Sequence, residues 1–419
     1  MQYVLFFIIA SVGVILWWNA SMRRRFKELM KGSTCIFLEQ MHIHEDGYSP
    51  NKGIWIGLQD LRKSIPYWSD CCIDTTHQAL SALWVQKDNA FEQLTSFVKQ
   101  YGDKVISFVW KHYDDEEGSF RNHVSAWPSL FATFSAIGII KDLIIVQRAS
   151  SVSDFDEMRK RPLSKEELVS VLGKDRVRKI SQFLRHCRSA LGGFSDTPYE
   201  SPTVVSSDAA IIVSWDMEEV YEDKDREDTK DFIWKCVKEI PDGKLAFKNS
   251  PGGGEYCSSF TRYAIRVLDR LKGIEKNSPD LDKVQKVVLF LKDCEDPSSG
   301  GYSWRPGKPP SIVHTNLVFN AFRKIVFEKG IVSEDGIIKP QKLASFIKMR
   351  IDQGLGYEKD SPPNMHVTAN TALLASRLAD KYRDQVKIDE KVRSTLRNAI
   401  LSFFDENEGG FRGYNPIKI

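Results

Sequence analysis

The chain has 419 residues, enough for one large domain or two ordinary ones. A composition of 42% hydrophobic and 27% charged residues excludes a disordered or collagen-like chain. The net charge of +3, without a long basic stripe, does not favour nucleic acid as the main partner. Seven irregularly spaced cysteines argue against a disulfide scaffold and favour reduced thiols facing the cytosol.

The N-terminal residues contain an almost wholly apolar run, Tyr3–Trp18, with a basic flank after it. Residues 3–20 would form about 27 Å of helix, at the short end of a membrane span. A cleaved signal peptide normally carries its positive charge before the apolar run. We therefore predict that residues 1–31 form a single-pass membrane anchor with the remaining chain in the cytoplasm. The alternative is an apolar helix that is buried in the fold or lies along a membrane.

A short motif, an acidic loop followed by Gly-Gly-aromatic, recurs along the chain. Its copies are Asp46-Gly47-Tyr48, Gly118-Ser119-Phe120, Gly192-Gly193-Phe194, a degenerate copy at 243–247, Gly300-Gly301-Tyr302, Gly354-Leu355-Gly356-Tyr357 and Gly409-Gly410-Phe411. The spacings between successive aromatic residues are 72, 74, 53, 55, 55 and 54. A nearly constant period of this size indicates stacked supersecondary units.

Helical apolar runs such as 208–213 and 368–374 follow the turns, and each interval has room for two helices of about 12 to 18 residues. Seven turns bracket six helix pairs. We predict an all-α fold, an (α/α)6 toroid that forms a single domain over residues 32–419 after the anchor. The first two intervals are longer, and we expect the charged stretch Ser153–Glu167 to loop over one rim.

Gly-Gly-aromatic turns that feed helix pairs resemble the repeats of prenyltransferases and squalene cyclases. The segment Gly300–Thr315 resembles the GG-x4-PGK-x5-HT segment of protein prenyltransferase β subunits, and 255–260 resembles their Asp-x-Cys-x-Ser-Phe. This resemblance implies a zinc site made of Glu255, Cys257 and His314 at the starts of adjacent inner helices. Three protein ligands leave the fourth zinc position open for a substrate thiol, which an allylic isoprenoid diphosphate would alkylate.

Two features depart from that family. Glu255 stands where the family has Asp, and Thr203 and Gly252 stand near positions where the family has basic residues for the diphosphate. The basic residues that could replace them from the same rim are Lys248, Arg262, Arg305 and Lys308. The family also works with a helical α subunit, so the resemblance implies a helical partner; a membrane enzyme is the partner expected of a non-catalytic toroid. The simpler interpretation makes Cys257 a buried apolar residue and His314 a helix-start residue.

Two other functions remain open. A class II terpene cyclase protonates an alkene from a DxDD motif, which this chain lacks, so Asp74 or Asp208 at inner-helix starts would be the acid. Each is equally an ordinary helix-capping or first-turn residue. The acidic run 114–117 is expected to be a solvated turn. His77, His123, Trp127 and His366 also fall near inner-helix starts, where they face a cavity or belong to the core. The third function is a toroid that binds a lipid or peptide without catalysis.

Overall fold

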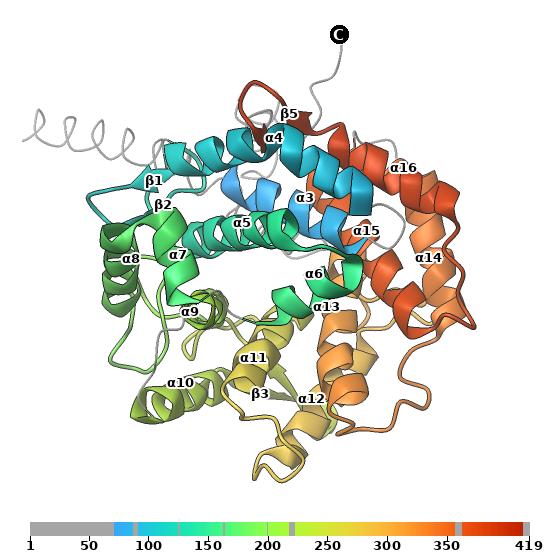
Figure 1. Cartoon of the computed structure of the whole chain (residues 1–419). Helices are drawn as coiled ribbons and strands as arrows, with labels where there is room; N and C mark the ends of the chain where they lie inside the picture. Colours follow the sequence, from blue (N-terminus) through green and yellow to red (C-terminus); the bar gives the residue numbers. More distant parts are fainter. Residues whose placement is uncertain are drawn as a thin grey trace, which may run out of the picture.

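The structure is a computed structural model that describes residues 71–86, 91–124, 126–161, 164–198, 200–217, 223–356 and 363–413. The predicted membrane anchor at residues 3–20 and the first turn, Asp46-Gly47-Tyr48, lie outside these ranges. Residues 71–413 form a helical toroid, which confirms the predicted all-α toroid for the described part of the chain (Figure 1).

Six helices form the inner ring of the described part. They are α3 (Ile73–Val85), α5 (Leu130–Arg148), α9 (Val204–Asp216), α11 (Ser258–Arg270), α13 (Ile312–Phe322) and α15 (Met365–Lys381). Each inner helix packs against the next one, and α15 packs against α3, so the ring is closed. Helices from opposite ends of the sequence are therefore neighbours at the α3–α15 seam (Figure 1).

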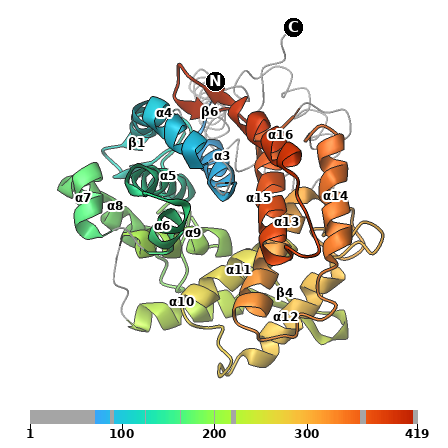
Figure 2. The ribbon, with the colours of Figure 1, turned by 45° about the vertical axis from the view of Figure 1, so that its right-hand side comes forward.

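Six further helices lie outside the ring, as Figure 2 shows for α14 and α16. They are α4 (Phe91–Lys111), α8 (Lys174–His186), α10 (Asp223–Lys235), α12 (Leu281–Asp293), α14 (Pro340–Asp352) and α16 (Glu390–Leu401). The stretch Ser153–Glu167, expected as a loop, instead contributes to α6 (Val152–Lys160) and α7 (Lys165–Leu172). Ser164 and Glu167 make a capping box at the start of α7, which explains why this charged segment is helical.

Short hairpins and single turns complete the described elements. The antiparallel pairs are β1 (Tyr113–Asp114) with β2 (Ser119–Phe120), β3 (Val237–Ile240) with β4 (Lys244–Phe247), and β5 (Phe404–Asp405) with β6 (Gly410–Phe411). A 3-10 turn, η3 (Pro241–Gly243), joins β3 to β4, and a π-helical turn, η4 (Arg323–Glu328), extends α13.

The turns of successive repeats have the same shape because they make the same hydrogen bond. In five units the backbone N–H of the turn's aromatic residue donates to a Thr or Ser hydroxyl in the first turns of an inner helix, at 2.8 to 3.1 Å. The pairs are Phe120 with Thr133, Phe194 with Ser207, Phe247 with Thr261, Tyr302 with Thr315 and Phe411 with Thr76. The last pair joins the end of the chain to α3 and closes the ring.

In each of these five inner helices the residue four positions before the Thr or Ser is the N-cap, and Asn364 is the N-cap of the sixth, α15. An N-cap closes the first turn of its helix. Its side chain accepts a hydrogen bond from the backbone N–H three residues later, which satisfies one of the helix's unpaired donors. The N-caps are Cys72, Ser129, Thr203, Cys257, Ser311 and Asn364. The chain therefore begins each inner helix in the same way and with the same rotational phase.

The paired glycines let the turns approach the outer helices. Gly300 has a φ of 73°, a left-handed conformation that favours glycine. A Cβ on Gly301 would lie 2.9 Å from the ring of Phe346 on α14. Any side chain at Gly301 would therefore displace the ring of Phe346.

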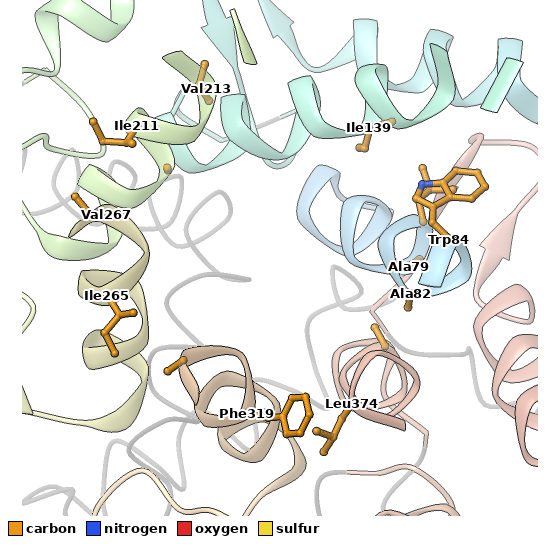
Figure 3. Close-up of a cluster of buried hydrophobic side chains, with 14 of the residues drawn as sticks. Ala79, Ala82, Trp84, Ile139, Ile211, Val213, Ile265, Val267, Phe319 and Leu374 are labelled. Carbon is orange, nitrogen blue, oxygen red and sulfur yellow. The ribbon is translucent and has the colours of Figure 1, made fainter. Parts of the chain in front are cut away.

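The hydrophobic core lies between the inner and outer helices and runs round the ring. Figure 3 shows side chains that all six inner helices contribute to it, among them Trp84, Ile139 and Phe319. Among the described helices, α5 alone is long and apolar enough to cross a membrane, and 78% of its most apolar window is buried. Its apolarity is explained by its place in the ring, where it contacts α3, α4 and α9.

Candidate functional site

A cavity of about 560 Å³ is lined by side chains from all six inner helices. Most of its helical lining residues lie one, five or nine positions after the Thr or Ser that is four residues past the N-cap. A spacing of four keeps them on one helix face. They are His77, Ser81, Phe134, Gly138, Asp142, Ile212, Asp216, Arg262, Arg266, Arg270, Asn316, Asn320, Ala369, Leu373 and Arg377.

One wall of the cavity carries a row of three arginines, Arg262, Arg266 and Arg270, on successive turns of α11. Arg266 donates through Nε and Nη2 to both carboxylate oxygens of Asp208 on α9. Arg262 is less well compensated, because its Nη1 lies 3.8 Å from the same carboxylate. Burial and the nearby Arg266 lower the pKa of Arg262 to about 10. This wall therefore holds positive charge that an anion would stabilise.

Near Arg270, at one end of the arginine row, the cavity wall carries charges of both signs. Lys141 Nζ on α5 lies 2.5 Å from Asp216 Oδ1 on α9, and both side chains are about 10% exposed. Arg270 lies over the ring of Trp215 at 4.9 Å. Burial raises the pKa of Asp216, although Lys141 opposes this effect. The Lys141–Asp216 ion pair thus stabilises this end of the cavity. Arg262 lies at the other end of the arginine row.

At the α3–α15 seam, Gln78 connects Asp74 to His366. Gln78 Nε2 donates to Asp74 Oδ2 at 2.9 Å, and Gln78 Oε1 accepts from His366 Nδ1. Ser135 on α5 contributes a long hydrogen bond of 3.5 Å to the other oxygen of Asp74. Burial raises the pKa of Asp74 to about 6, and these hydrogen bonds only partly oppose the rise. All three linked side chains line the cavity.

The adjacent His77 packs in a gap that a glycine leaves open. Its ring meets Phe134 edge to face at a centroid distance of 5.1 Å. A Cβ on Gly138 would come within 2.5 Å of His77 Nε2. An alanine at Gly138 would therefore push His77 into the cavity.

The walls formed by α13 and α15 carry an array of amide groups. Asn316 Oδ1 accepts from Arg377 Nη1 at 3.1 Å and from Asn320 Nδ2 at 3.3 Å. Asn316 Nδ2 donates to Asn370 Oδ1 at 2.7 Å. The cavity thus combines polar sectors with apolar ones, to which Phe131, Ile212, Leu317 and Leu373 contribute.

The predicted zinc ligands are not brought together. Glu255 has a side chain 59% exposed and pairs with Arg305. Cys257 caps α11, and burial raises the pKa of its thiol to about 11. His314 lines the cavity, with Nδ1 2.6 Å from Ser311 Oγ. No group of three or more His, Cys, Asp or Glu side chains in the described ranges could hold a metal ion. This arrangement does not fit zinc, and zinc binding stays a prediction from the sequence.

Of the four predicted diphosphate ligands, Arg262 alone lines the cavity. Lys248 donates to the carbonyl of Pro251. Arg305 donates to the carbonyl of Tyr256 at 2.6 Å and stacks on the rings of Tyr256 and Trp304 at 4.4 Å. Lys308 lies in the loop before α13, outside the cavity lining. Arg266 and Arg270, which follow Arg262 at intervals of four, also line the cavity and were not among the predicted ligands.

The two predicted cyclase acids differ in their surroundings. Asp208 accepts from Nε and Nη2 of Arg266 with its two oxygens, so it is held in an ion pair with the arginine row. Asp74 faces the cavity.

The remaining candidates lie elsewhere. Asp115, Glu116 and Glu117 are exposed, as predicted for a solvated turn, whereas Asp114 is buried and accepts backbone hydrogen bonds within that turn. His123 and Trp127 are not among the lining residues, and Trp127 is 65% exposed.

Comparisons with known proteins agree with the toroid. The family model for the prenyltransferase alpha-alpha toroid domain matches residues 58–165 and 163–358. The geranylgeranyl transferase type-2 subunit beta of Saccharomyces cerevisiae is 24% identical over 346 residues, which cover 80% of this chain and 86% of that protein.

Two solved structures are similar to this chain at low identity. Candida albicans protein geranylgeranyltransferase-I complexed with GGPP is 15% identical, with a TM-score of 0.49, and the match covers 78% of this chain and 92% of that chain. The type II terpene cyclase MstE from Scytonema is 11% identical, with a TM-score of 0.40 and coverage of 75% and 89%. Similarity at this level carries no argument about chemistry.

Proposed function

This chain belongs to the prenyltransferase alpha-alpha toroid family, and from that premise we propose that its cavity binds an isoprenoid diphosphate and transfers the prenyl group to a thiol or similar nucleophile. The observation that carries the proposal is the row of Arg262, Arg266 and Arg270 along one wall of a cavity whose other sectors include apolar side chains. The arginines suit the diphosphate, and the apolar sectors suit the hydrocarbon chain.

The arginine row has a specific task in such a transfer. When the bond between C1 of the isoprenoid and its oxygen breaks, the electron pair leaves with the diphosphate, which gains negative charge. Guanidinium groups already in place stabilise that charge without reorganisation. Arg262 is best suited to the task because Asp208 neutralises it less closely than it neutralises Arg266.

The test is the binding of geranylgeranyl diphosphate to the full chain, measured by titration calorimetry. We expect Arg262→Gln to weaken binding about 10- to 100-fold, since a hydrogen bond to a charged group contributes about 1.5–3 kcal/mol. Lys308→Gln is the matched control, because it removes a cation that lies outside the cavity. Failure of the parent to bind, or equal losses in both variants, would contradict the proposal.

No step of the proposed transfer uses zinc. Glu255 is engaged by Arg305 and Cys257 caps a helix, so no step is assigned to a metal. The thiol's proton must therefore go to another group.

Asp74 favours a second candidate, an isoprenoid cyclase that protonates an alkene. A cavity-facing carboxyl whose pKa is raised to about 6 by burial is partly protonated near neutral pH, as such an acid requires. Asp74→Asn would then abolish the cyclisation of geranylgeranyl diphosphate without weakening its binding. Mass spectrometry of the products measures the cyclisation. Alkylation of a thiol by the parent, with no cyclised product, would identify a transferase instead. Binding with neither reaction would leave a lipid-binding toroid.

The remaining proposals concern location and partners. We propose that residues 3–20 anchor the chain to a membrane with the toroid in the cytoplasm, because of the apolar run and its basic flank. Release of the full chain from membranes by alkaline wash would contradict this. We also propose a helical partner subunit, because the yeast relative is described as a subunit. Co-purification from the native source tests it.

A further inference from the structure

We propose that His366 is the general base that takes the proton from the acceptor nucleophile, with Gln78 and Asp74 as positioning residues. This inference rests on the proposed transferase function and adds a residue to its chemistry. It starts from the linked side chains Asp74, Gln78 and His366 at the seam between the first and last inner helices.

The hydrogen-bond chain determines which nitrogen of His366 is basic. The Asp74 carboxylate can only accept, so the amide nitrogen of Gln78 must face it. The amide oxygen of Gln78 then faces His366 Nδ1, and because an amide oxygen can only accept, Nδ1 must carry a proton. In the neutral imidazole the lone pair therefore lies on Nε2, which is the form a general base needs.

Titratable and charged groups from several helices line the cavity together with His366. Asp74 and His77 contribute from α3, His314 from α13 and Arg350 from α14, and all of them line the same cavity. Above its pKa of about 6, Asp74 is a carboxylate. Its charge, relayed through the Gln78 amide dipole, stabilises an imidazolium that forms at His366, whereas Arg350 opposes it.

The transfer step needs such a base in this chain. A free thiol has a pKa of about 8.5 and is mostly protonated at neutral pH. Glu255, Cys257 and His314 are not brought together as a metal site that would lower that value. In the step, the S–H proton passes to His366 Nε2 and sulfur bonds to C1. The C1–oxygen bond then gives its electron pair to the diphosphate on the α11 wall.

The first experiment compares the full chain with His366→Asn. Asparagine keeps an N–H donor for Gln78, so the seam should fold normally. The probes are geranylgeranyl diphosphate and a cysteine-containing tetrapeptide. We expect kcat to fall about 10²- to 10⁴-fold, the usual contribution of a general base, with the affinity for the diphosphate changed less than about twofold. His186→Asn, at the exposed end of α8, is the control.

The second experiment asks whether Gln78 acts through His366. Gln78→Leu removes the amide that links Asp74 to His366, so an imidazolium at His366 is less stabilised. The acidic limb of the rate–pH profile should then move to lower pH, and in His186→Asn it should not. A purely structural role would change the amount of folded protein without moving the limb.

Each outcome decides something different. Lost transfer with retained binding in His366→Asn supports the base. Retained transfer overturns the base and leaves the proposed function standing. A parent that binds no geranylgeranyl diphosphate, or binds it without alkylating the peptide, overturns the transferase function and the base together.

Discussion

Cys257 and Cys72 occupy the same place in two repeats, and this separates a structural role from a metal site. Each is the N-cap of an inner helix, and each sulfur accepts from the backbone N–H three residues later, at 3.5 Å and 3.4 Å. Cys257 belongs to the predicted zinc motif, whereas Cys72 does not. The shared cap explains Cys257 without a metal.

Cysteine-to-serine variants at both positions test this. Serine caps helices well, so we expect Cys257→Ser and Cys72→Ser each to change the free energy of unfolding by less than about 0.5 kcal/mol. Cys257→Ala should cost about 1 kcal/mol through the lost cap. Denaturant unfolding and zinc content by plasma mass spectrometry are the measurements. One zinc per parent chain that disappears in Cys257→Ser but not in Cys72→Ser would restore the zinc site.

At the scale of the element, each turn also caps the preceding inner helix. Asn122 caps α3, Asp196 caps α5 and Asn249 caps α9, each with a backbone oxygen and a side-chain oxygen that accept successive N–H groups. Asp196 is the ionisable member of this set. Burial raises its pKa to about 6, although the donated hydrogen bonds oppose the rise.

The raised pKa of Asp196 predicts how Asp196→Asn changes the stability of the fold. Because the folded pKa lies above the unfolded value of about 3.9, the parent loses stability as pH rises from about 4 to 6. Asparagine keeps the acceptor and has no charge to desolvate. We expect the variant to be about 1–2 kcal/mol more stable than the parent at pH 7 and equal to it near pH 4. Thermal unfolding across this range measures it. The exposed change Asp231→Asn on α10 should show no such trend.

The sequence predicted helix pairs and turns because their determinants are local. Glycine at positive φ, as at Gly300, and a cap such as Ser311 act within a few residues. The residues that face the axis of the toroid depend on how each inner helix is rotated about its own axis. A hydroxyl such as that of Thr315 sets this rotation by accepting a hydrogen bond from the backbone of a turn. That phase identifies the arginine row of α11, which composition and motif matching do not reveal. Arg305, taken for a phosphate ligand, is instead held by stacking on two aromatic rings.

At the scale of the whole molecule, the ring is closed by contacts between its ends. Phe411 bonds Thr76 on α3 through its backbone, and the carbonyl of Gly413 accepts from the first N–H of α15 at 2.9 Å. In a ring of repeats each unit contacts its neighbours, and the last turn adds to the direct packing of α15 against α3. The linked side chains Asp74, Gln78 and His366 lie across that seam.

Phe411→Ala therefore affects the site as well as stability. Removing a fully buried phenylalanine costs about 3–5 kcal/mol. Because the lost ring packs against Phe97 on α4, and β6 contacts α3 and α4, hydrogen exchange should rise first in α3 and α4 and later in α9. Phe247→Ala, at the equivalent position between α10 and α11, should cost a similar amount and raise exchange in α11 and α12 instead. If both variants loosened the ring evenly, the seam would not be a separate unit. Local loosening at Phe411 combined with a loss of transfer activity that Phe247→Ala does not share would connect ring closure to the chemistry of the cavity.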